Sequence, residues 1–439
     1  MKTVNTSPIS GMQELSPEKQ AHFDYLKSKI DETYKSHGFL KIETPIIERS
    51  EILFAKAGED TEKQIYKVIK TAESAEDSTQ ALRFDHTVPL ARYIVEHENS
   101  LTFPFKVSQI GRNFRGERAQ KGRFREFYQC DIDIIGRNSL PITYDADVIA
   151  TLLSTLKAFK LKTPILARIS NRKILSGLLE AMNLQSQAKD IYSIIDHSEK
   201  VPPEKTKQNF EELGLGTETI SKLLSFIEIN GSCNEATKQL NSLGVDNPTF
   251  SEGIAELTTI LSLLESIGLE NNVQVDMKIV RGLDYYTGTV FEFILPEHKE
   301  IGSICGGGRY DNLTGYFSEQ SFPGVGGSIG LTRLFYILNE RHLLEDVPAT
   351  PIEYAIIPIS SSEHSYCFKL ADVLRDSGHS ATVVLTDKKL GDKLSYSAKI
   401  AKNGIVIGEE EVKTSKLQTK DFTTGTTKTI DINTVTGTI

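Results

Sequence analysis

The sequence predicts an α+β protein of more than one domain, and three observations lead to that class. Apolar residues at every second position, as in residues 273–279, indicate half-buried strands. Apolar residues three or four positions apart, as in residues 254–267, indicate amphipathic helices. A run of helical patterns without strands interrupts the mixed part of the chain, which at 439 residues is long enough for two or three domains.

Composition is that of an ordinary globular protein, with 39% hydrophobic and 25% charged residues. The net charge of -9 argues against a surface coated by nucleic acid but allows a local basic patch. The four cysteines form no C-x-x-C pair, so neither a disulfide framework nor a zinc ribbon is indicated. No stretch is apolar enough for a signal peptide or a membrane span. We therefore expect a reduced, soluble, cytoplasmic protein without membrane contact.

The first part of the chain predicts a helix, a broken strand, a second helix and a long hairpin. The helix has Ser16 as N-cap, Pro17 at its first position and Gly38 at its end. A strand follows that Pro45 interrupts. After a helix at residues 86–97, apolar runs on both sides of a hydrophilic segment predict the hairpin.

The middle of the chain predicts a helical module. Residues 172–245 contain three helical patterns with no obvious strand between them. A helix that Gly268 ends follows, and then a strand that runs to Arg281. We expect the mixed domain to comprise residues 1–171 and 246–340, with residues 172–245 as an insertion.

The last part of the chain predicts a small α/β domain. Two prolines mark residues 341–351 as a linker. In residues 352–439, short apolar strands alternate with helical patterns. Three lysines here fit either phosphate contacts or a solvated helix face, namely Lys388, Lys389 and Lys393.

A strongly basic loop spans residues 111–126, with six cations and only two acids, Glu117 and Glu126. Charge runs of this kind are usually solvated hairpin tips. Aromatic residues interleave here, and the planar fork of arginine binds phosphate through two hydrogen bonds, which favours a loop that closes over nucleotide or nucleic acid. The cations are Arg112, Arg115, Arg118, Lys121, Arg123 and Arg125.

Two further segments carry polar groups in apolar surroundings. Asp85 and Thr87 fit a helix N-cap before Pro89, or an anchor for an ammonium group. Gln129, Asp131 and Asp133 alternate along a predicted strand, so they share one face. That face points either to water or to a ligand.

One arginine and two glycine-rich segments are further candidates for a functional site. By the alternation of residues 273–279, Arg281 places a permanent cation on the apolar side of its strand. Residues 306–308 are three glycines, which form a turn or let a ligand approach the backbone closely. The glycine-rich residues 324–334 lack the Gly-Lys-Ser/Thr of a Walker A loop and the spacing of a dinucleotide fold.

Five ordered segments, spread along nearly the whole chain, resemble the histidyl-tRNA synthetases, a family of class II aminoacyl-tRNA synthetases. Residues 38–48, GFLKIETPIIE, resemble motif 1, the dimer-interface strand. Residues 114–129, FRGERAQKGRFREFYQ, resemble motif 2, and residues 324–334, GVGGSIGLTRL, resemble motif 3. Residues 281–292, RGLDYYTGTVFE, and 305–311, CGGGRYD, resemble the two stretches peculiar to the histidine enzyme.

The resemblance implies a class II catalytic domain with an antiparallel sheet and helices, a helical insertion, and a C-terminal α/β anticodon-binding domain. It implies ATP-dependent activation of histidine to histidyl-adenylate, followed by transfer of histidine to the 3′ end of its tRNA. ATP, Mg²⁺ and tRNA(His) are the implied partners, and the implied assembly is a homodimer. One alternative is a non-catalytic histidine-sensing regulatory paralogue, which typically lacks the stretch that begins at Arg281 and the anticodon domain. The other is an RNA-binding or stress-sensing module.

The resemblance also implies roles for single residues in binding histidine. Asp85, Thr87 and Gln129 would hold the α-ammonium group. Asp133 and Tyr286 would bracket the imidazole, because neutral imidazole offers one donor and one acceptor on opposite sides. Tyr285 and Tyr310 would form the pocket wall.

For ATP, the resemblance implies Arg115 and Arg281 as catalytic contacts to the α-phosphate and Arg333 as the γ-phosphate contact. Phe127 would stack near the adenine, and Glu117 belongs to the same ATP site. Gln120 and Arg123 would contact tRNA, and no metal site made only of protein ligands is implied.

Three positions depart from the family pattern. Thr332 stands where many members carry glutamate, which bears on magnesium handling. Asp85 stands where many bacterial members have glutamate, and Ala119 where proline is frequent.

Overall fold

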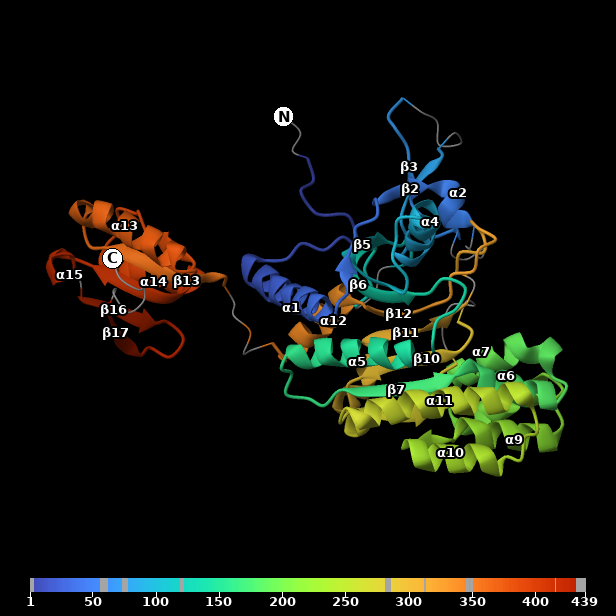
Figure 1. The fold of residues 1–439 in the computed structure, drawn as a ribbon. Helices are drawn as coiled ribbons and strands as arrows, with labels where there is room; N and C mark the ends of the chain where they lie inside the picture. Colours follow the sequence, from blue (N-terminus) through green and yellow to red (C-terminus); the bar gives the residue numbers. More distant parts are fainter. Residues whose placement is uncertain are drawn as a thin grey trace. The chain divides into compact units, whose positions relative to one another are not determined.

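The computed structural model describes residues 4–55, 62–72, 78–118, 122–280, 286–311, 313–344, 347, 350–414 and 416–431. Contacts divide the chain into two compact units, residues 1–13 with 27–343 and residues 14–26 with 344–439. Figure 1 shows the elements of both units.

A nine-stranded sheet organises the first unit, in the order β1-β5-β6-β12-β11-β10-β7-β9-β8. Neighbouring strands are antiparallel except for the pairs β1–β5 and β7–β9. This sheet confirms the predicted α+β class. Its strands are β1 (Leu40–Lys41), β5 (Phe105–Phe114), β6 (Glu126–Ile135), β7 (Leu166–Asn171), β8 (Asn230–Gly231), β9 (Val273–Asp276), β10 (Thr289–Ile294), β11 (Cys305–Tyr310) and β12 (Gly324–Ile329).

Helices pack on this sheet and beside it. Helix α5 (Thr143–Ala158) contacts β6, β11 and β12, and α11 (Pro248–Ser266) contacts α5 and β7, so both lie on the sheet (Figure 1). Asn247 caps α11 by accepting a hydrogen bond from the amide of Phe250. The first unit also contains α2 (Ser50–Phe54), α4 (Thr87–His97) and α12 (Leu331–Glu340), with the 3-10 helices η3 (Glu270–Asn272) and η4 (Pro296–Ile301). The residues of α1 (Pro17–Ser36) are divided between the two units.

A small second sheet, in the order β2-β4-β3, lies next to α2 in the chain. Its strands are β2 (Ile47–Arg49), β3 (Lys67–Val68) and β4 (Gln80–Leu82). Strand β2 follows the break that Pro45 was expected to cause after β1.

Helices fill the chain between β7 and β9, apart from the two-residue strand β8. Strand β8 pairs antiparallel with β9, and its two residues, Asn and Gly, carry no apolar signal. Helix α10 begins with a capping box in which Ser232 and Glu235 exchange side-chain and backbone hydrogen bonds. Besides α11 and η3, the helices are α6 (Arg172–Ala181), η1 (Gln185–Gln187), α7 (Ala188–His197), η2 (Ser198–Lys200), α8 (Pro203–Glu212), α9 (Thr217–Ile227) and α10 (Cys233–Ser242).

Strand β9 ends earlier than predicted, and one of the two alternatives for the glycines at 306–308 is excluded. Strand β9 ends at Asp276, five residues before the predicted end at Arg281, because the Asp276 side chain accepts a hydrogen bond from the amide of Lys278 and pairs with Arg168. The glycines at 306–308 form strand β11 and not a turn. A Cβ on Gly307 would lie 2.1 Å from the carbonyl oxygen of Gly326, so this glycine allows close approach of two strands.

The second unit contains a five-stranded sheet in the order β14-β13-β15-β16-β17, parallel in its first three strands. Its predicted elements are β13 (Ile352–Pro358), α13 (His364–Asp376), β14 (Ala381–Val383), α14 (Leu390–Ile400) and β15 (Ala401–Ile407), and η5 (Ser361–Glu363) and α15 (Glu409–Thr414) are also present. The hairpin β16 (Lys416–Asp421) and β17 (Thr427–Asp431) was missed. Asp421 stabilises its turn by accepting hydrogen bonds from the amides of Thr423 and Thr424.

One lysine of this unit contradicts both of its predicted uses. Lys393 is buried, and its Nζ donates a hydrogen bond of 2.9 Å to the carbonyl oxygen of Pro358. It is therefore neither a phosphate contact nor part of a solvated face.

None of the helices in the described part of the chain combines the length and apolar character needed to cross a bilayer.

Candidate active site

The central strands β6, β11 and β12 form the floor of a cavity of about 150 Å³. Chain segments far apart in the sequence meet around it, from the start of α4, the hairpin β5–β6, and the strands that follow Tyr286. The lining residues are Asp85, Thr87, Arg115, Gln129, Asp131, Asp133, Tyr286, Gly306, Tyr310, Gly326, Gly327 and Ser328.

Three alternate residues of β6 face this cavity. Gln129, Asp131 and Asp133 line it, while Cys130 and Ile132 are fully buried on the other side of the sheet. The period of two therefore brings polar groups to one face, and that face belongs to a cavity and not to open solvent.

Asp85 stabilises the start of a helix and also lines the cavity. Its Oδ1 accepts a hydrogen bond of 3.0 Å from the amide of Val88, so it caps the start of α4. The same side chain lines the cavity together with Thr87. Burial raises the pKa of the Asp85 carboxyl above its ordinary value, and the hydrogen bond from Val88 and the charge of Arg115 oppose that shift.

Asp133 and Tyr310 form a buried pair at the far end of the strand face. The Tyr310 hydroxyl donates a hydrogen bond of 2.7 Å to Oδ1 of Asp133. Burial raises the pKa of Asp133 to about 7, although the hydrogen bond from Tyr310 acts in the opposite direction. Burial and the neighbouring Asp133 carboxylate raise the pKa of Tyr310 well above its usual value, so this hydroxyl acts as a donor at neutral pH.

A glycine makes room for the Asp133 carboxylate. A Cβ on Gly326, which is paired with Asp133 across β6 and β12, would lie 2.0 Å from Asp133 Oδ1. The glycine-rich sequence of β12 therefore serves the shape of the cavity as well as the packing of its strands.

Among the described residues that line the cavity, one is an arginine, Arg115. Its guanidinium stacks on two aromatic rings. The guanidinium carbon lies 4.4 Å from the ring centroid of Phe84 and 5.0 Å from that of Phe127. Stacking on aromatic faces orients the planar fork while leaving its edge for hydrogen bonds. A cation held in this way beside the carboxylates of the cavity suits an anionic group of a ligand that spans both.

The remaining predicted site residues lie outside the described lining of the cavity. Arg333 Nη2 donates to the carbonyl oxygen of Ile301 at 2.9 Å, and its side chain lies close to Gly122 of the basic loop. Glu117 Oε2 lies 3.7 Å from Arg123 Nη1, and the Phe127 ring stacks on Arg115, which lines the cavity. Arg281, Tyr285 and Gln120 lie outside the described residues, so their roles stay predictions.

Thr332, which departs from the family pattern, has a clear structural contact. Its Oγ1 accepts a hydrogen bond of 2.7 Å from the amide of Tyr128, which ties the first turn of α12 to strand β6. In the described part of the chain, no group of three or more His, Cys, Asp or Glu side chains is arranged to hold a metal ion.

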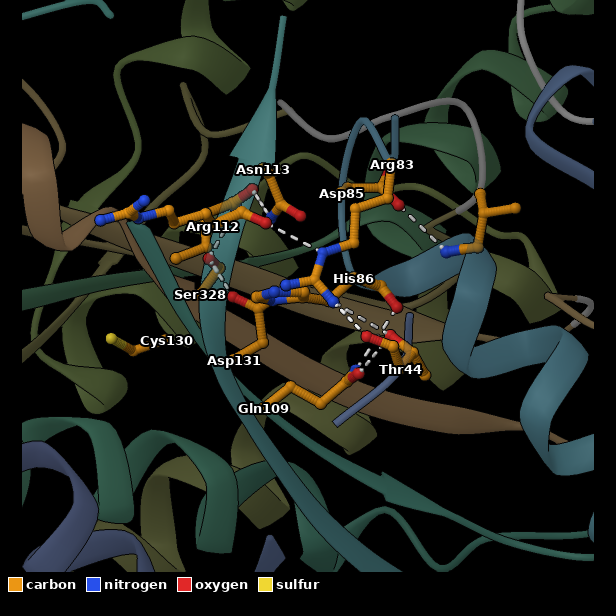
Figure 2. A network of polar contacts seen from close by, with 12 residues as sticks. Thr44, Arg83, Asp85, His86, Gln109, Arg112, Asn113, Cys130, Asp131 and Ser328 are labelled. Atoms are coloured by element: carbon orange, nitrogen blue, oxygen red, sulfur yellow. Dashed lines mark hydrogen bonds and ion pairs between the residues drawn. The ribbon is translucent and has the colours of Figure 1, made fainter. Parts of the chain in front are cut away.

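A polar network that extends from the cavity lining to buried residues was not predicted (Figure 2). Arg83 is 1% exposed and donates to the carbonyl oxygens of Arg112 and Thr44, at 2.9 and 2.6 Å. His86 pairs with Asp131, and Ser328 donates to the same carboxylate. The sequence signal for Asp131 was its alternation with Gln129 and Asp133, whereas His86 and Ser328 have no pattern that marks them.

An antiparallel sheet whose central strand presents carboxylates to a cavity, with a stacked arginine from the adjoining hairpin, defines a class II aminoacyl-tRNA synthetase. A family model described as "Histidyl-tRNA synthetase" matches residues 11–334, and one described as "Anticodon binding domain" matches residues 353–439. The chain belongs to the histidyl-tRNA synthetase family.

Full-length relatives agree with this assignment. The chain is 41% identical over 432 residues to a histidine–tRNA ligase of Clostridium tetani, covering 98% of this chain and 97% of the relative. It is 40% identical to the histidine–tRNA ligase of Clostridium acetobutylicum, covering 98% of both chains. The crystal structure of histidyl-tRNA synthetase from Nostoc sp. PCC 7120 superimposes with a TM-score of 0.89 at 35% identity, covering 99% of this chain and 98% of the other.

Proposed function

We propose that this chain activates histidine with ATP and transfers the histidyl group to the 3′ end of its tRNA. The observation that carries the proposal is the cavity itself, which joins the buried Asp133–Tyr310 pair to the stacked cation Arg115. An amino acid whose side chain is a neutral hydrogen-bonding ring fits the first, and a phosphate fits the second.

In the amino-acid part of the cavity, the carboxylate of Asp133 and the hydroxyl of Tyr286 would read the two imidazole nitrogens. A site built to pair both nitrogens discriminates strongly against apolar analogues, which would leave its polar groups unpaired. Asp85, Thr87 and Gln129 would bind the α-ammonium group, since all three line the same cavity. Tyr310 and Tyr285 complete the wall in this proposal.

In the activation step, a carboxylate oxygen of histidine attacks the α-phosphorus of ATP and pyrophosphate leaves. Charge develops on the phosphoryl oxygens, and cations already in position stabilise it without reorganisation. We assign this role to Arg115 and Arg281, with Arg333 on the γ-phosphate, Phe127 near the adenine and Glu117 in the same site. Mg²⁺ would accompany the ATP phosphates, where it neutralises their charge while keeping most of its water ligands.

For tRNA, we assign contacts to Gln120 and Arg123 in the basic loop and anticodon-stem binding to residues 352–439. The match of residues 353–439 to an anticodon-binding domain supports the second assignment. We keep the proposed boundaries of a catalytic domain at 1–171 and 246–340, an insertion at 172–245 and a linker at 341–351. Because charged tRNA is used by ribosomes, we propose that the protein acts in the cytoplasm.

We further propose a symmetric homodimer formed through the motif 1 segment. Large apolar side chains of that segment are exposed, with Leu40 at 63%, Ile47 at 47% and Ile46 at 40%. Leu40 lies on β1, an edge strand of the large sheet. Apolar groups at a sheet edge are typical of a surface that a second copy covers.

The test is histidine-dependent exchange of pyrophosphate into ATP, followed by charging of tRNA(His). We expect exchange with histidine and not with other amino acids, and charging of the transcript in the second assay. Exchange with another amino acid would overturn the histidine assignment, and exchange without charging would overturn the tRNA role. Histidine binding without any exchange would support the regulatory paralogue, which the relatives named as ligases do not favour.

A further inference from the structure

A directed chain of hydrogen bonds runs along the lining of the cavity. Asn113 Nδ2 donates to Gln129 Oε1 at 2.9 Å, and Gln129 Nε2 donates to Ser328 Oγ at 2.9 Å. The Ser328 hydroxyl then donates to Oδ1 of Asp131. Every donor in the chain therefore points toward one carboxylate.

His86 holds that carboxylate from the other side (Figure 2). Its Nδ1 lies 3.0 Å from Asp131 Oδ2, and its ring is 1% exposed. Since a carboxylate accepts hydrogen bonds and does not donate them, Nδ1 must carry the hydrogen. The other ring nitrogen has no hydrogen-bond partner among the described residues and packs against Gly111, where a Cβ would come within 3.2 Å of it. The ring is thus fixed by the Asp131 pair and by packing.

The charge of Asp131 decides which atom donates in each hydrogen bond of this series. Ser328 has one hydroxyl hydrogen and donates it in the hydrogen bond to Asp131. The Ser328 oxygen can therefore only accept a hydrogen bond from the Gln129 amide nitrogen. The Gln129 carbonyl oxygen must then face Asn113. An amide has no steric reason to choose one orientation over its flipped form, so the choice rests on these partners.

We propose that Asp131 and His86 are positioning residues that fix the Gln129 amide for binding the substrate α-ammonium group. This rests on the proposed function, in which Gln129 contacts that group. The carbonyl oxygen has two lone pairs, and Asn113 uses one of them. The second is available to an ammonium donor, whereas a flipped amide would present N–H groups to a cation.

The sharpest test is Ser328→Ala, which breaks the link between Asp131 and Gln129 without changing any charge. We expect the Kd for histidine, measured by calorimetry, to rise about tenfold to a hundredfold, as for the loss of one hydrogen bond to a charged group. The KM for ATP in the exchange assay should change less than about threefold. Ser170→Ala is the matched control, because Ser170 is a buried serine of the same sheet whose hydroxyl contacts the sulfur of Met277.

Two variants of His86 separate positioning from bulk packing. His86→Asn keeps a side-chain N–H that can donate to Asp131, so it should bind histidine within about fivefold of the wild type. His86→Leu removes the donor and should weaken histidine binding as Ser328→Ala does. Thermal unfolding of both variants identifies any loss that comes from the fold, and equal weakening by both at equal stability would overturn the role of the hydrogen bond.

Two analogues locate the effect on the ligand. Histidinol retains the ammonium group and the imidazole, whereas imidazole propionate lacks the ammonium group. In Ser328→Ala, the Kd for histidinol should rise and that for imidazole propionate should stay the same. Equal changes for both analogues, or no change for either, would overturn the inference. Because these are binding measurements, a wild-type protein that binds histidine but shows no exchange would refute the proposed reaction alone.

Discussion

The hydroxyl of Tyr310 lies 2.7 Å from Oδ1 of Asp133, and both side chains are nearly excluded from solvent. One hydrogen bond does not offset the loss of water around this carboxyl, which is why the pKa of Asp133 is raised to about 7. Asp133 therefore changes charge close to neutral pH. An imidazole donor would supply the partner that the carboxylate lacks.

Asp133→Asn should change how stability depends on pH. The folded-state pKa of about 7 exceeds the ordinary value of 3.8, so between these values the folded protein holds a proton that the unfolded chain has released. The free energy of unfolding therefore falls as pH rises through this window, and the loss is complete above pH 7. The free energy of unfolding of Asp133→Asn, taken relative to that of the wild type, should therefore rise by about 2–4 kcal/mol from pH 4 to pH 8. Urea unfolding at each pH measures it. Asp246→Asn, at an exposed loop position, is the control, and parallel pH curves for all three proteins would contradict the prediction.

Arg115→Ala should slow adenylate formation without unfolding the protein. Loss of one preplaced donor to a transition-state oxyanion raises the barrier by about 2.7–4 kcal/mol, so kcat for ATP–pyrophosphate exchange should fall roughly a hundredfold to a thousandfold. Arg112→Ala serves as the control, because Arg112 is half-exposed and pairs with Glu126. Similar losses from both variants would mean that Arg115 acts through the shape of the loop.

Arg281→Ala should lower adenylate formation by roughly a hundredfold or more while the fold stays intact, on the same scale of transition-state stabilisation. Pre-steady-state measurement of histidyl-adenylate isolates this step from tRNA charging. Circular dichroism of the variant checks the fold. Near-normal exchange would refute the assignment of Arg281 to the α-phosphate.

Leu40→Glu should weaken the proposed homodimer, because it places a charge on an apolar edge strand that a second copy would cover. Sedimentation velocity over a range of concentrations should show a dimer for the wild type and a larger monomer fraction for the variant. Ile267→Glu is the matched control, since Ile267 is 61% exposed, close to the 63% of Leu40, but follows α11 on another part of the unit. A monomeric wild type at working concentration would contradict the proposed homodimer.

Binding of tRNA(His) should depend steeply on salt. An acidic protein must bind RNA through local basic patches, and each phosphate contact releases condensed counterions. A plot of log affinity against log salt concentration should therefore be a falling straight line, with the affinity for histidine nearly flat as the internal control. A flat response for tRNA would contradict binding through the basic loop.

The sequence predicted those parts of the fold whose signal is local. The hairpin β5–β6, the helix α4 and the helix α11 follow directly from hydrophobic period and from breakers such as Pro45 and Gly268. The early end of β9 could not be predicted, because it depends on Arg168 from β7 pairing with Asp276. The hairpin β16–β17 was missed because threonine shares its inward face with leucine, as Leu417 and Thr419 show, and leaves no apolar alternation.

The site divides in the same way. Alternation along residues 129–133 predicted one polar face, and the family resemblance selected lining residues from distant segments. His86 was missed because its role depends on a contact with Asp131, 45 positions away, and a single histidine between Asp85 and Thr87 carries no periodic signal. Ser328 was missed because it lies within a run of glycines whose evident purpose was backbone approach.

The absence of a side chain at Gly326 limits how this pocket can be redesigned. Even one methyl group there would occupy the place of the Asp133 oxygen, so a substitution of Gly326 would displace the carboxylate instead of reshaping the space around it. Anyone who wishes to make the enzyme accept an unnatural histidine analogue should leave Gly326 unchanged. Tyr286, which is half-buried and outside the paired strands, offers the better starting point for a mutant library.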